Sequence, residues 1–276
     1  MNQILNRFSG KTVIVTGASA GVGAACARAF ANEGAKLVLV ARGKEALQKI
    51  SDELQSTTEV LSVAMDVGDN NACLDLITKA KERFGSIHVL VNNAGMHARG
   101  DVEHVEANDI AAMVDINLRA PLLLTAAALP HLMEAKTGAI VMVGSLAGRA
   151  PMQGAATYAA TKAGLRAFTY GLADELTGSG IHIGVVSPGP IDTGFIMSEI
   201  DNVADIVFSQ PMSSADSVAE AILQIASGQK LEICMPALSG RVTTLGYIFP
   251  ALRRWLRPKL DAAGRKNKEK YREENR

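Results

Sequence analysis

The sequence predicts an α/β protein built on one doubly wound parallel sheet of about seven strands, with helices on both faces. Short runs rich in Val, Ile and Leu alternate with longer helical patterns up to about Pro236. This alternation is typical of strands that are buried on both faces and followed by crossover helices. A glycine-rich turn joins the first strand to the first helix, and no repeat or linker interrupts the pattern. We therefore expect a single α/β domain over residues 1–240 and an extension over 241–276.

Composition and charge exclude several classes of protein. The 276 residues are 48% hydrophobic and 20% charged, which favours a folded globular chain over a disordered one. The formal net charge of +0 gives no sign of a nucleic-acid partner. The first residues lack the apolar run of a secretory signal, and the apolar stretch 120–133 is shorter than the ~20 residues that span a bilayer. We expect a soluble, cytoplasmic protein.

The sequence contains no metal-binding pattern. Cys26, Cys73 and Cys234 lie far apart, and their odd number suits a reducing compartment. The five histidines show no metal-ligand spacing either. One of them, His97, follows a turn at the end of a predicted strand. It could approach the active site or could simply be solvated.

The first strand, Thr12–Thr16, leads into the glycine-rich turn and then into an Ala-rich helix. Glycines let the backbone approach a pyrophosphate, and the helix N-terminus attracts its negative charge. A tight connection without a ligand is the alternative. The strand–turn–helix context favours a dinucleotide site instead. The expected contacts are Gly17, Ser19, Ala20, Gly21, Val22 and Gly23.

The end of the second strand, Lys36–Ala41, indicates which dinucleotide binds. NAD enzymes usually carry a carboxylate there that binds the ribose 2′-hydroxyl. Here Ala41 and Arg42 occupy the position, and a guanidinium can pair with a 2′-phosphate. The sequence therefore favours NADP(H) over NAD(H), with Lys44 as a second phosphate contact. The alternative is that Arg42 merely begins a solvated helix.

Several polar residues follow later strands at the edge of the sheet where ligands bind. Asp66 and Val67 follow the third strand and could contact the adenine ring, and Asn92–Gly95 follows the fourth. Ser145 follows the fifth strand, and Asn117 lies within a long helical pattern. The expected elements are strands over 59–65, 87–91, 138–143, 181–186 and 231–236, and helices over 70–84, 107–133 and from Tyr158 to about 175.

Tyr158 and Lys162 are four residues apart and so lie on one face of a helix. A nearby ammonium favours the phenolate and lowers the pKa of a tyrosine from its usual ~10. Tyr158 could then exchange a proton with a substrate oxygen, to which Ser145 would also hydrogen-bond. The spacing alone occurs often by chance on solvated helices, so its meaning depends on the motifs that precede it.

Together these motifs resemble the short-chain dehydrogenase/reductase family. The ordered set is Thr16-Gly17-x-x-x-Gly21-x-Gly23, Asp66, Asn92-Asn-Ala-Gly95, Asn117, Ser145, Tyr158-x-x-x-Lys162 and Pro188-Gly189. It covers roughly residues 8–237. The resemblance implies a Rossmann-type fold, a small-molecule substrate and a homodimer or homotetramer.

The resemblance also implies roles for individual residues. Asn117, Ser145, Tyr158 and Lys162 would form a catalytic tetrad in which Tyr158 is the general acid or base. Lys162 would lower the pKa of that tyrosine and hold the nicotinamide ribose. Ser145 would polarise the carbonyl, and Asn117 would support a water. Further cofactor contacts would come from Asn93, Ala94, Gly95, Pro188, Gly189, Ile191 and Thr193.

The C-terminal part departs from the commonest family pattern. About forty residues follow the last predicted strand. With Arg42, this ending is similar to the NADPH-using branch that contains hydroxysteroid dehydrogenases and lipophilic carbonyl reductases. The resemblance places a substrate lid over 191–211. There, apolar side chains could line the pocket or could simply pack a helix: Phe195, Ile196, Met197 and Phe208.

The extension itself mixes aromatic and basic residues. Residues 241–257 could contact a membrane surface, cover the substrate mouth, bind a subunit partner or form a docked extension with a solvated tail. After Leu260 the sequence is highly charged, and we expect disorder there.

The function that the sequence favours is reduction or oxidation at a carbonyl or alcohol with NADP(H), on a lipophilic ketone or aldehyde. One alternative is a reductase of 3-oxoacyl thioesters. Another, from a different class, is a sensor that binds NADP(H) without chemistry.

Overall fold

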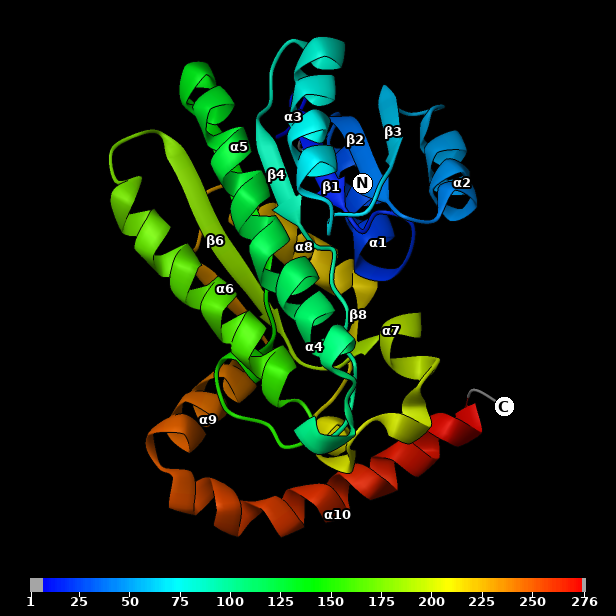
Figure 1. Ribbon diagram of the computed structural model, residues 1–276, viewed down its shortest axis with the longest axis vertical. Helices are drawn as coiled ribbons and strands as arrows, with labels where there is room; N and C mark the ends of the chain where they lie inside the picture. The colour runs from blue at the N-terminus through cyan, green and yellow to red at the C-terminus, as the bar shows by residue number, and fades with distance from the viewer. Residues whose placement is uncertain (1–6, 275–276) are drawn as a thin grey trace, which may run out of the picture.

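The structure is a computed structural model that describes residues 7–274. Its main sheet has seven parallel strands in the order β3-β2-β1-β4-β5-β6-β9 (Figure 1). This confirms the predicted doubly wound sheet. Strand order reverses between β1 and β4, and ligands of such sheets bind at the carboxyl ends next to that point. The strands are β1 (Thr12–Thr16), β2 (Lys36–Ala41), β3 (Val60–Ala64), β4 (Val89–Asn92), β5 (Gly138–Val143), β6 (Ile181–Pro188) and β9 (Glu232–Met235).

Helices cover both faces of the sheet and bury two apolar clusters. Alternate residues of β1 point to opposite faces: Val13 and Val15 pack into one cluster and Ile14 into the other, all fully buried. This explains why the strand is a continuous apolar run. The first face carries α1 (Gly21–Asn32), α2 (Lys44–Leu54) and α8 (Ala215–Ala226), and the second carries α3 (Asn70–Phe84), α5 (Ala120–Ala135) and α6 (Ala156–Glu175).

The predicted long helix is continuous but not uniform. It comprises α4 (Ala107–Val114), a π-helical segment η2 (Asp115–Arg119) and α5. Its 29 residues are long and apolar enough to cross a membrane by length and composition alone. Here the helix packs on the sheet as a core helix of the domain. Its buried contact residues are spaced four apart: Ala120, Leu124, Ala128 and Leu132.

A separate small unit covers the carboxyl ends of the strands. Two-residue strands β7 (Ile191–Asp192) and β8 (Ser213–Ser214) pair in parallel and close a loop. Within that loop, Ile196, Val203 and Phe208 form their own buried cluster. We call residues 191–214 the lid. It contains the short helices α7 (Gly194–Met197), η4 (Ile200–Asn202) and η5 (Asp205–Ser209).

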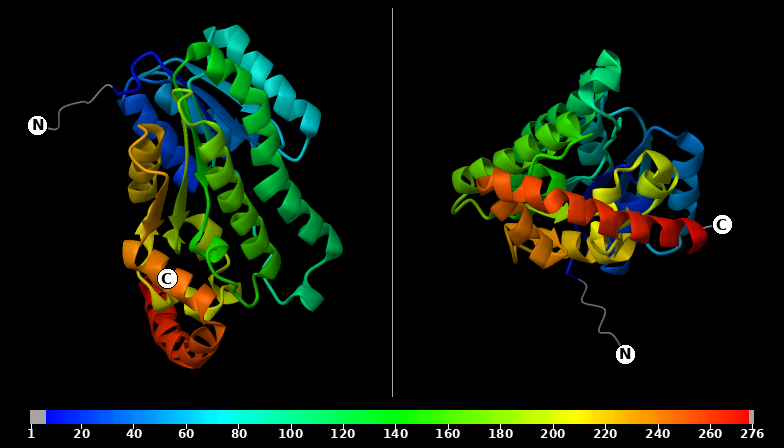
Figure 2. Two further views of the ribbon diagram at one scale, coloured as in Figure 1. Left: turned by 90° about the vertical axis from the view of Figure 1, so that its left-hand side faces the viewer. Right: turned by 90° about the horizontal axis from the view of Figure 1, so that it is seen from below.

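The C-terminal extension differs from the expected disordered tail. It forms α9 (Ala237–Ile248) and α10 (Pro250–Glu274), which cross the end of the molecule where the lid lies (Figures 1 and 2). The ordering has a packing reason. Lys268 is 6% exposed, and its Nζ donates to the Val203 carbonyl at 2.7 Å. Gly264 packs on the Asp205 backbone, where a Cβ would come within 1.8 Å of the carbonyl oxygen. A charged helix is therefore stable here because it packs against the lid.

Candidate active site

The glycine-rich turn lies between the end of β1 and the start of α1. Gly17 and Gly21 have φ of +67° and +53°, a region that side chains disfavour. Gly23 has no room for a side chain, since a Cβ would be 2.0 Å from the Gly17 carbonyl oxygen. Asn93 fastens this turn to the end of β4, because its Nδ2 donates to the Thr16 carbonyl at 2.9 Å. The turn is therefore a fixed cradle of backbone.

The start of α1 fits a pyrophosphate. Ala20 is the N-cap, and no side chain accepts a hydrogen bond from the first turn. The first N–H groups are thus free to bind an anion, which the helix dipole favours. Thr193 of the lid lies opposite, 3.4 Å from where a Gly21 Cβ would be. The structure therefore places two of the predicted cofactor contacts, Gly21 of the turn and Thr193 of the lid, next to each other.

Arg42 and Asp66 follow the neighbouring strands β2 and β3. The side chain of Arg42 is 70% exposed, and its Nη1 lies 3.9 Å from the Asp66 carboxylate. Asp66 also accepts a hydrogen bond from the Gly68 N–H at 2.8 Å. An exposed ion pair of this length contributes little stability. The guanidinium is therefore not held by a strong ion pair, and its role in binding a 2′-phosphate stays a prediction.

Ser145, Tyr158 and Lys162 meet at the carboxyl end of β5. Tyr158, near the start of α6, lies close enough to Ser145 for that side chain to act on its pKa. Lys162, one turn later, is 5% exposed, and its Nζ donates to the Val143 carbonyl at 2.9 Å. The same Nζ lies 5.8 Å from the centroid of the Tyr158 ring. The four-residue spacing thus places phenol and ammonium on the same side of the helix, as predicted.

Asn117 lies in the π-helical segment, and its side chain is fully buried. Its amide bonds both backbone groups of Met96, accepting from the N–H at 2.8 Å and donating to the carbonyl at 2.8 Å. It thereby holds the loop that follows β4. Gly95 in that loop faces Asn117 and Lys162, because a Cβ there would be 3.2 Å from Oδ1 and 3.7 Å from Nζ. The structure therefore brings the four predicted tetrad residues together at the carboxyl ends of β4 and β5.

The pKa values of this group depart from the expectation. Burial raises the pKa of Tyr158 above its usual value, and the hydrogen bond to Ser145 and the charge of Arg99 only partly offset this. The ammonium of Lys162 donates to the Val143 carbonyl rather than to the phenol oxygen. Burial also lowers the pKa of Lys162 to about 8. In the free protein the tyrosine is thus a neutral proton donor.

His97 contacts the tyrosine directly. Its ring is stacked on that of Tyr158, with centroids 4.1 Å apart and planes 13° apart. Its Nδ1 lies 2.9 Å from Nη1 of Arg99. A guanidinium can only donate, so Nδ1 accepts and the proton of the neutral ring is on Nε2. Burial, then Arg99 and Lys162, lower the pKa of His97 to about 3, and the ring is neutral near pH 7.

Arg99 connects this pair to the lid and was not predicted from the sequence. Its Nη2 donates to the Phe195 carbonyl at 2.9 Å, and its Nε pairs with Glu199 at 3.2 Å. The side chain is only 10% exposed. Arg99 stands outside the recognisable motifs, so only the folded arrangement of the loop and lid reveals its contacts.

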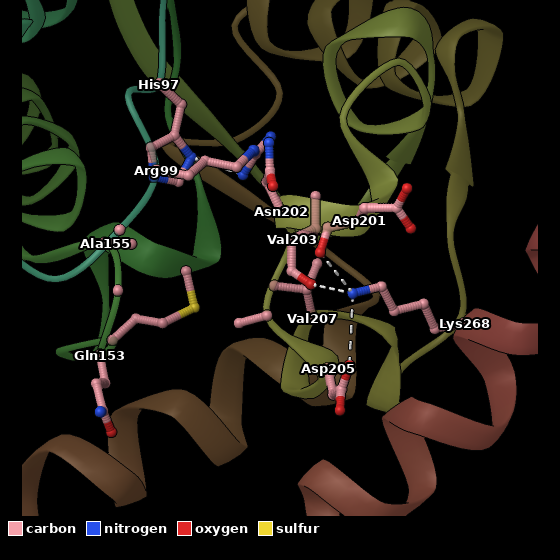
Figure 3. Close-up of a pocket in the computed structure, with 14 residues that line it drawn as sticks. His97, Arg99, Gln153, Ala155, Asp201, Asn202, Val203, Asp205, Val207 and Lys268 are labelled. Atoms are coloured by element: carbon pink, nitrogen blue, oxygen red, sulfur yellow. Dashed lines mark hydrogen bonds and ion pairs between the residues drawn. The ribbon is translucent and has the colours of Figure 1, made fainter. Parts of the chain in front are cut away.

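A cleft of about 350 Å³ lies beside His97, between the lid and the loop that precedes α6. Figure 3 shows Lys268 reaching from α10 to the lid backbone at its edge. None of the four apolar lid residues considered for the pocket wall lines the cleft, which favours the packing alternative. Ile196 and Phe208 are buried within the lid itself, and Phe195 lies under Arg99 at 5.7 Å. Met197 packs against the same lid cluster. The apolar side chains that line the cleft are instead Met152, Val203 and Val207.

Comparisons with known proteins agree with this geometry. The family model for the short chain dehydrogenase matches residues 11–204. Sulfoacetaldehyde reductase 2 of Chromohalobacter salexigens is 36% identical over 222 residues, covering 78% of this chain and 88% of that protein. Ketoacyl reductase HetN of Nostoc sp. is 34% identical over 257 residues, covering 89% and 88%.

A solved structure also matches. A metagenomic short-chain oxidoreductase in complex with NADP superimposes with a TM-score of 0.71 at 31% identity, over 83% of this chain and 97% of that chain. The matched residues include the glycine turn, Asn117, Ser145, Tyr158 and Lys162, all of which fall within residues 11–204. The chain therefore belongs to the short-chain dehydrogenase family.

Proposed function

We propose that this protein is an NADP(H)-dependent oxidoreductase that interconverts a carbonyl and an alcohol. The observation that carries the proposal is the placement of Tyr158 close to Ser145 and beside the buried Lys162. When bound, the nicotinamide would supply or accept the hydride. The glycine turn, the N-terminus of α1 and Arg42 would hold its phosphates, and the NADP-bound relative supports this choice of cofactor.

The protein's own residues would supply position and the proton. Tyr158 is protonated because burial raises its pKa, so it can donate a proton to a substrate oxygen in the reductive direction. Ser145 would donate a second hydrogen bond to the same oxygen. Lys162 is a buried cation whose pKa is about 8, and its charge would stabilise the phenolate that remains.

Replacement of the tyrosine tests this mechanism. Tyr158→Phe keeps the ring and removes the proton, and we expect kcat to fall by about 10²–10⁴-fold. Turnover would be followed by NADPH absorbance over a panel of ketones and aldehydes. Activity of the variant near that of the wild type would exclude Tyr158 as the proton donor.

The cofactor preference has its own test. Arg42→Asp places a carboxylate where a 2′-phosphate would bind, and we expect the ratio of kcat/KM for NADPH over NADH to fall at least tenfold. Lys44→Gln is the matched control, because Lys44 lies on the exposed start of α2 and is only a secondary contact. An unchanged ratio for Arg42→Asp would remove Arg42 from the site.

The proposed substrate is a lipophilic ketone or aldehyde, in line with the branch that the sequence resembles. Met152 and Val207 give the cleft apolar surface. Two of its cations are already engaged, because Arg99 pairs with Glu199 and Lys268 binds lid carbonyls. These pairings leave little charge free to select a strongly ionic substrate.

A second candidate is reduction of a 3-oxoacyl thioester. The relative named ketoacyl reductase HetN aligns over 89% of this chain, so it extends into the C-terminal part. Comparing an acyl thioester with a simple ketone of equal chain length would separate the two candidates. Cofactor binding without turnover on either would instead support a non-catalytic NADP(H) sensor.

We also propose a cytoplasmic homodimer or homotetramer whose C-terminal segment can contact a membrane. Exposed Val114 and Met133 on the long helix are apolar surface that a second subunit could cover. Sedimentation of the wild type and of Met133→Glu tests the assembly, and a wild-type monomer would refute it.

A further inference from the structure

The first half of the C-terminal extension exposes an unusual amount of apolar surface. The described residues contain thirteen exposed large hydrophobic side chains, and eight of these lie between positions 238 and 255. Clusters of this kind on a soluble protein mark an interaction surface. We call them the apolar arm: Leu238, Val242, Leu245, Tyr247, Ile248, Phe249, Leu252 and Trp255.

The arm is built as a continuous surface. Leu238, Val242 and Leu245 are spaced four and three apart and so share one face of α9. Phe249 connects the two helices, and Trp255 lies in the second turn of α10. Trp255 is 64% exposed, as much as Tyr247. Tyr and Trp are favoured where one end of a side chain is apolar and the other is wet, as at a bilayer interface.

The charge around the arm has a single sign. Residues 233–260 contain no Asp or Glu and five basic residues, namely Arg241, Arg253, Arg254, Arg257 and Lys259. The Nζ of Lys259 lies 5.0 Å from the Trp255 ring centroid, so apolar and basic groups are interleaved. Within the described range, neither Arg241 nor Arg254 forms an ion pair with an acidic residue. Arg257 pairs with Asp261 at 3.2 Å. The surface therefore offers apolar side chains together with a net positive charge.

From this we infer that the apolar arm docks the protein on an anionic lipid bilayer. Burial of apolar side chains together with attraction between basic residues and anionic headgroups gives reversible binding. A second copy of this chain would place the same net positive charge against itself, which charge repulsion disfavours. The bilayer satisfies both the apolar and the basic part of the surface.

The other half of α10 ties this docking to the substrate cleft. Lys268 and Gly264 hold the lid, and Arg253 Nη1 lies 3.4 Å from the Pro151 carbonyl in the loop beside the cleft. The arm and the lid therefore lie at the end of the molecule that α10 crosses (Figure 2), and lid residues line the cleft. The last step rests on the proposed lipophilic substrate: the docked enzyme takes that substrate from the bilayer.

Trp255 provides a direct measurement, because it is the only tryptophan of the chain. The full-length protein is mixed with vesicles of phosphatidylcholine alone or with a minority of phosphatidylglycerol. We expect a blue shift of the fluorescence and co-flotation with the anionic vesicles only, both reversed by high salt. No substrate or cofactor is needed, so a failure here is distinct from a failure of the proposed activity.

Variants test the apolar and the basic side chains of the surface separately. Phe249→Glu should abolish flotation, and Arg241→Gln with Arg254→Gln should weaken partitioning by about thirty-fold, from ~1 kcal/mol per basic residue. Leu74→Glu is the control, since Leu74 is also exposed but belongs to another helix, α3. Wild-type protein that stays soluble with anionic vesicles overturns the inference. So does a wild type that forms a dimer broken by Phe249→Glu without binding vesicles.

Discussion

The imidazole of His97 lies almost parallel to the phenol ring of Tyr158, with ring centroids 4.1 Å apart. The histidine belongs to the loop after β4, whereas the tyrosine belongs to α6. Arg99 holds the outer edge of the imidazole through Nδ1 and also bonds the lid backbone at Phe195. The position of the proposed proton donor is thus linked to the lid through one arginine and one stacked ring.

Loss of the stacked ring should lower activity. His97→Ala removes a contact of roughly 0.5–1.5 kcal/mol, so we expect kcat to fall by roughly three- to tenfold as Tyr158 gains freedom. His97→Phe is the matched control, because it keeps an aromatic ring on the tyrosine. Steady-state kinetics on both variants checks this. Equal losses would show that the bond to Arg99, and not the ring, positions Tyr158.

The same histidine should make the protein sensitive to acid. Its folded pKa of about 3 lies below the usual 6.5, so the unfolded chain takes up a proton first as the pH falls. The contribution of His97 to the free energy of unfolding is then fully present above pH ~6.5 and is lost as the pH falls toward ~3. By pH ~5 the loss amounts to about 2 kcal/mol. Urea titrations at these pH values would measure it. His97→Phe should lose less stability than the wild type, and an equal loss would assign the effect to other groups.

Much of the fold and site could be predicted from local sequence. The glycine turn has backbone conformations that few other residues adopt, and Tyr158 and Lys162 are brought together by one turn of helix. Such features need only local geometry. Arg99 and Glu232 could not be predicted, because their partners are distant in sequence: Glu232 binds Arg149, 83 residues away. The order of α10 was also missed, since its charged composition hides the buried contacts of Lys268 and Gly264.

Gly264 should be intolerant of a side chain. A Cβ would be 1.8 Å from the Asp205 carbonyl oxygen, so Gly264→Ala should push α10 off the lid even though alanine favours helix. We expect a higher KM and faster proteolysis after about residue 250. Gly246→Ala in α9 is the control, because the nearest atom to its Cβ is 3.8 Å away. If both variants behave like the wild type, α10 does not support the lid.

Glu232 should be the most sensitive charged residue for stability. Its side chain is 8% exposed and pairs with both Arg149 and Arg166, while Ser187 and Tyr170 donate to it at 2.8 Å each.

These hydrogen bonds outweigh burial and lower the pKa of Glu232 to about 2. Glu232→Gln leaves two arginines without their counter-charge, and removing one partner of a buried pair costs about 3–5 kcal/mol. The free energy of unfolding in urea at neutral pH would be compared with that of Glu59→Gln. Glu59 forms an ion pair with Lys36 at 2.7 Å but is 47% exposed, so solvent screens the pair and its loss should cost far less. Equal losses in the two variants would mean that solvent screens the Glu232 cluster as it does a surface pair, and that β9 is held to α6 by apolar packing alone.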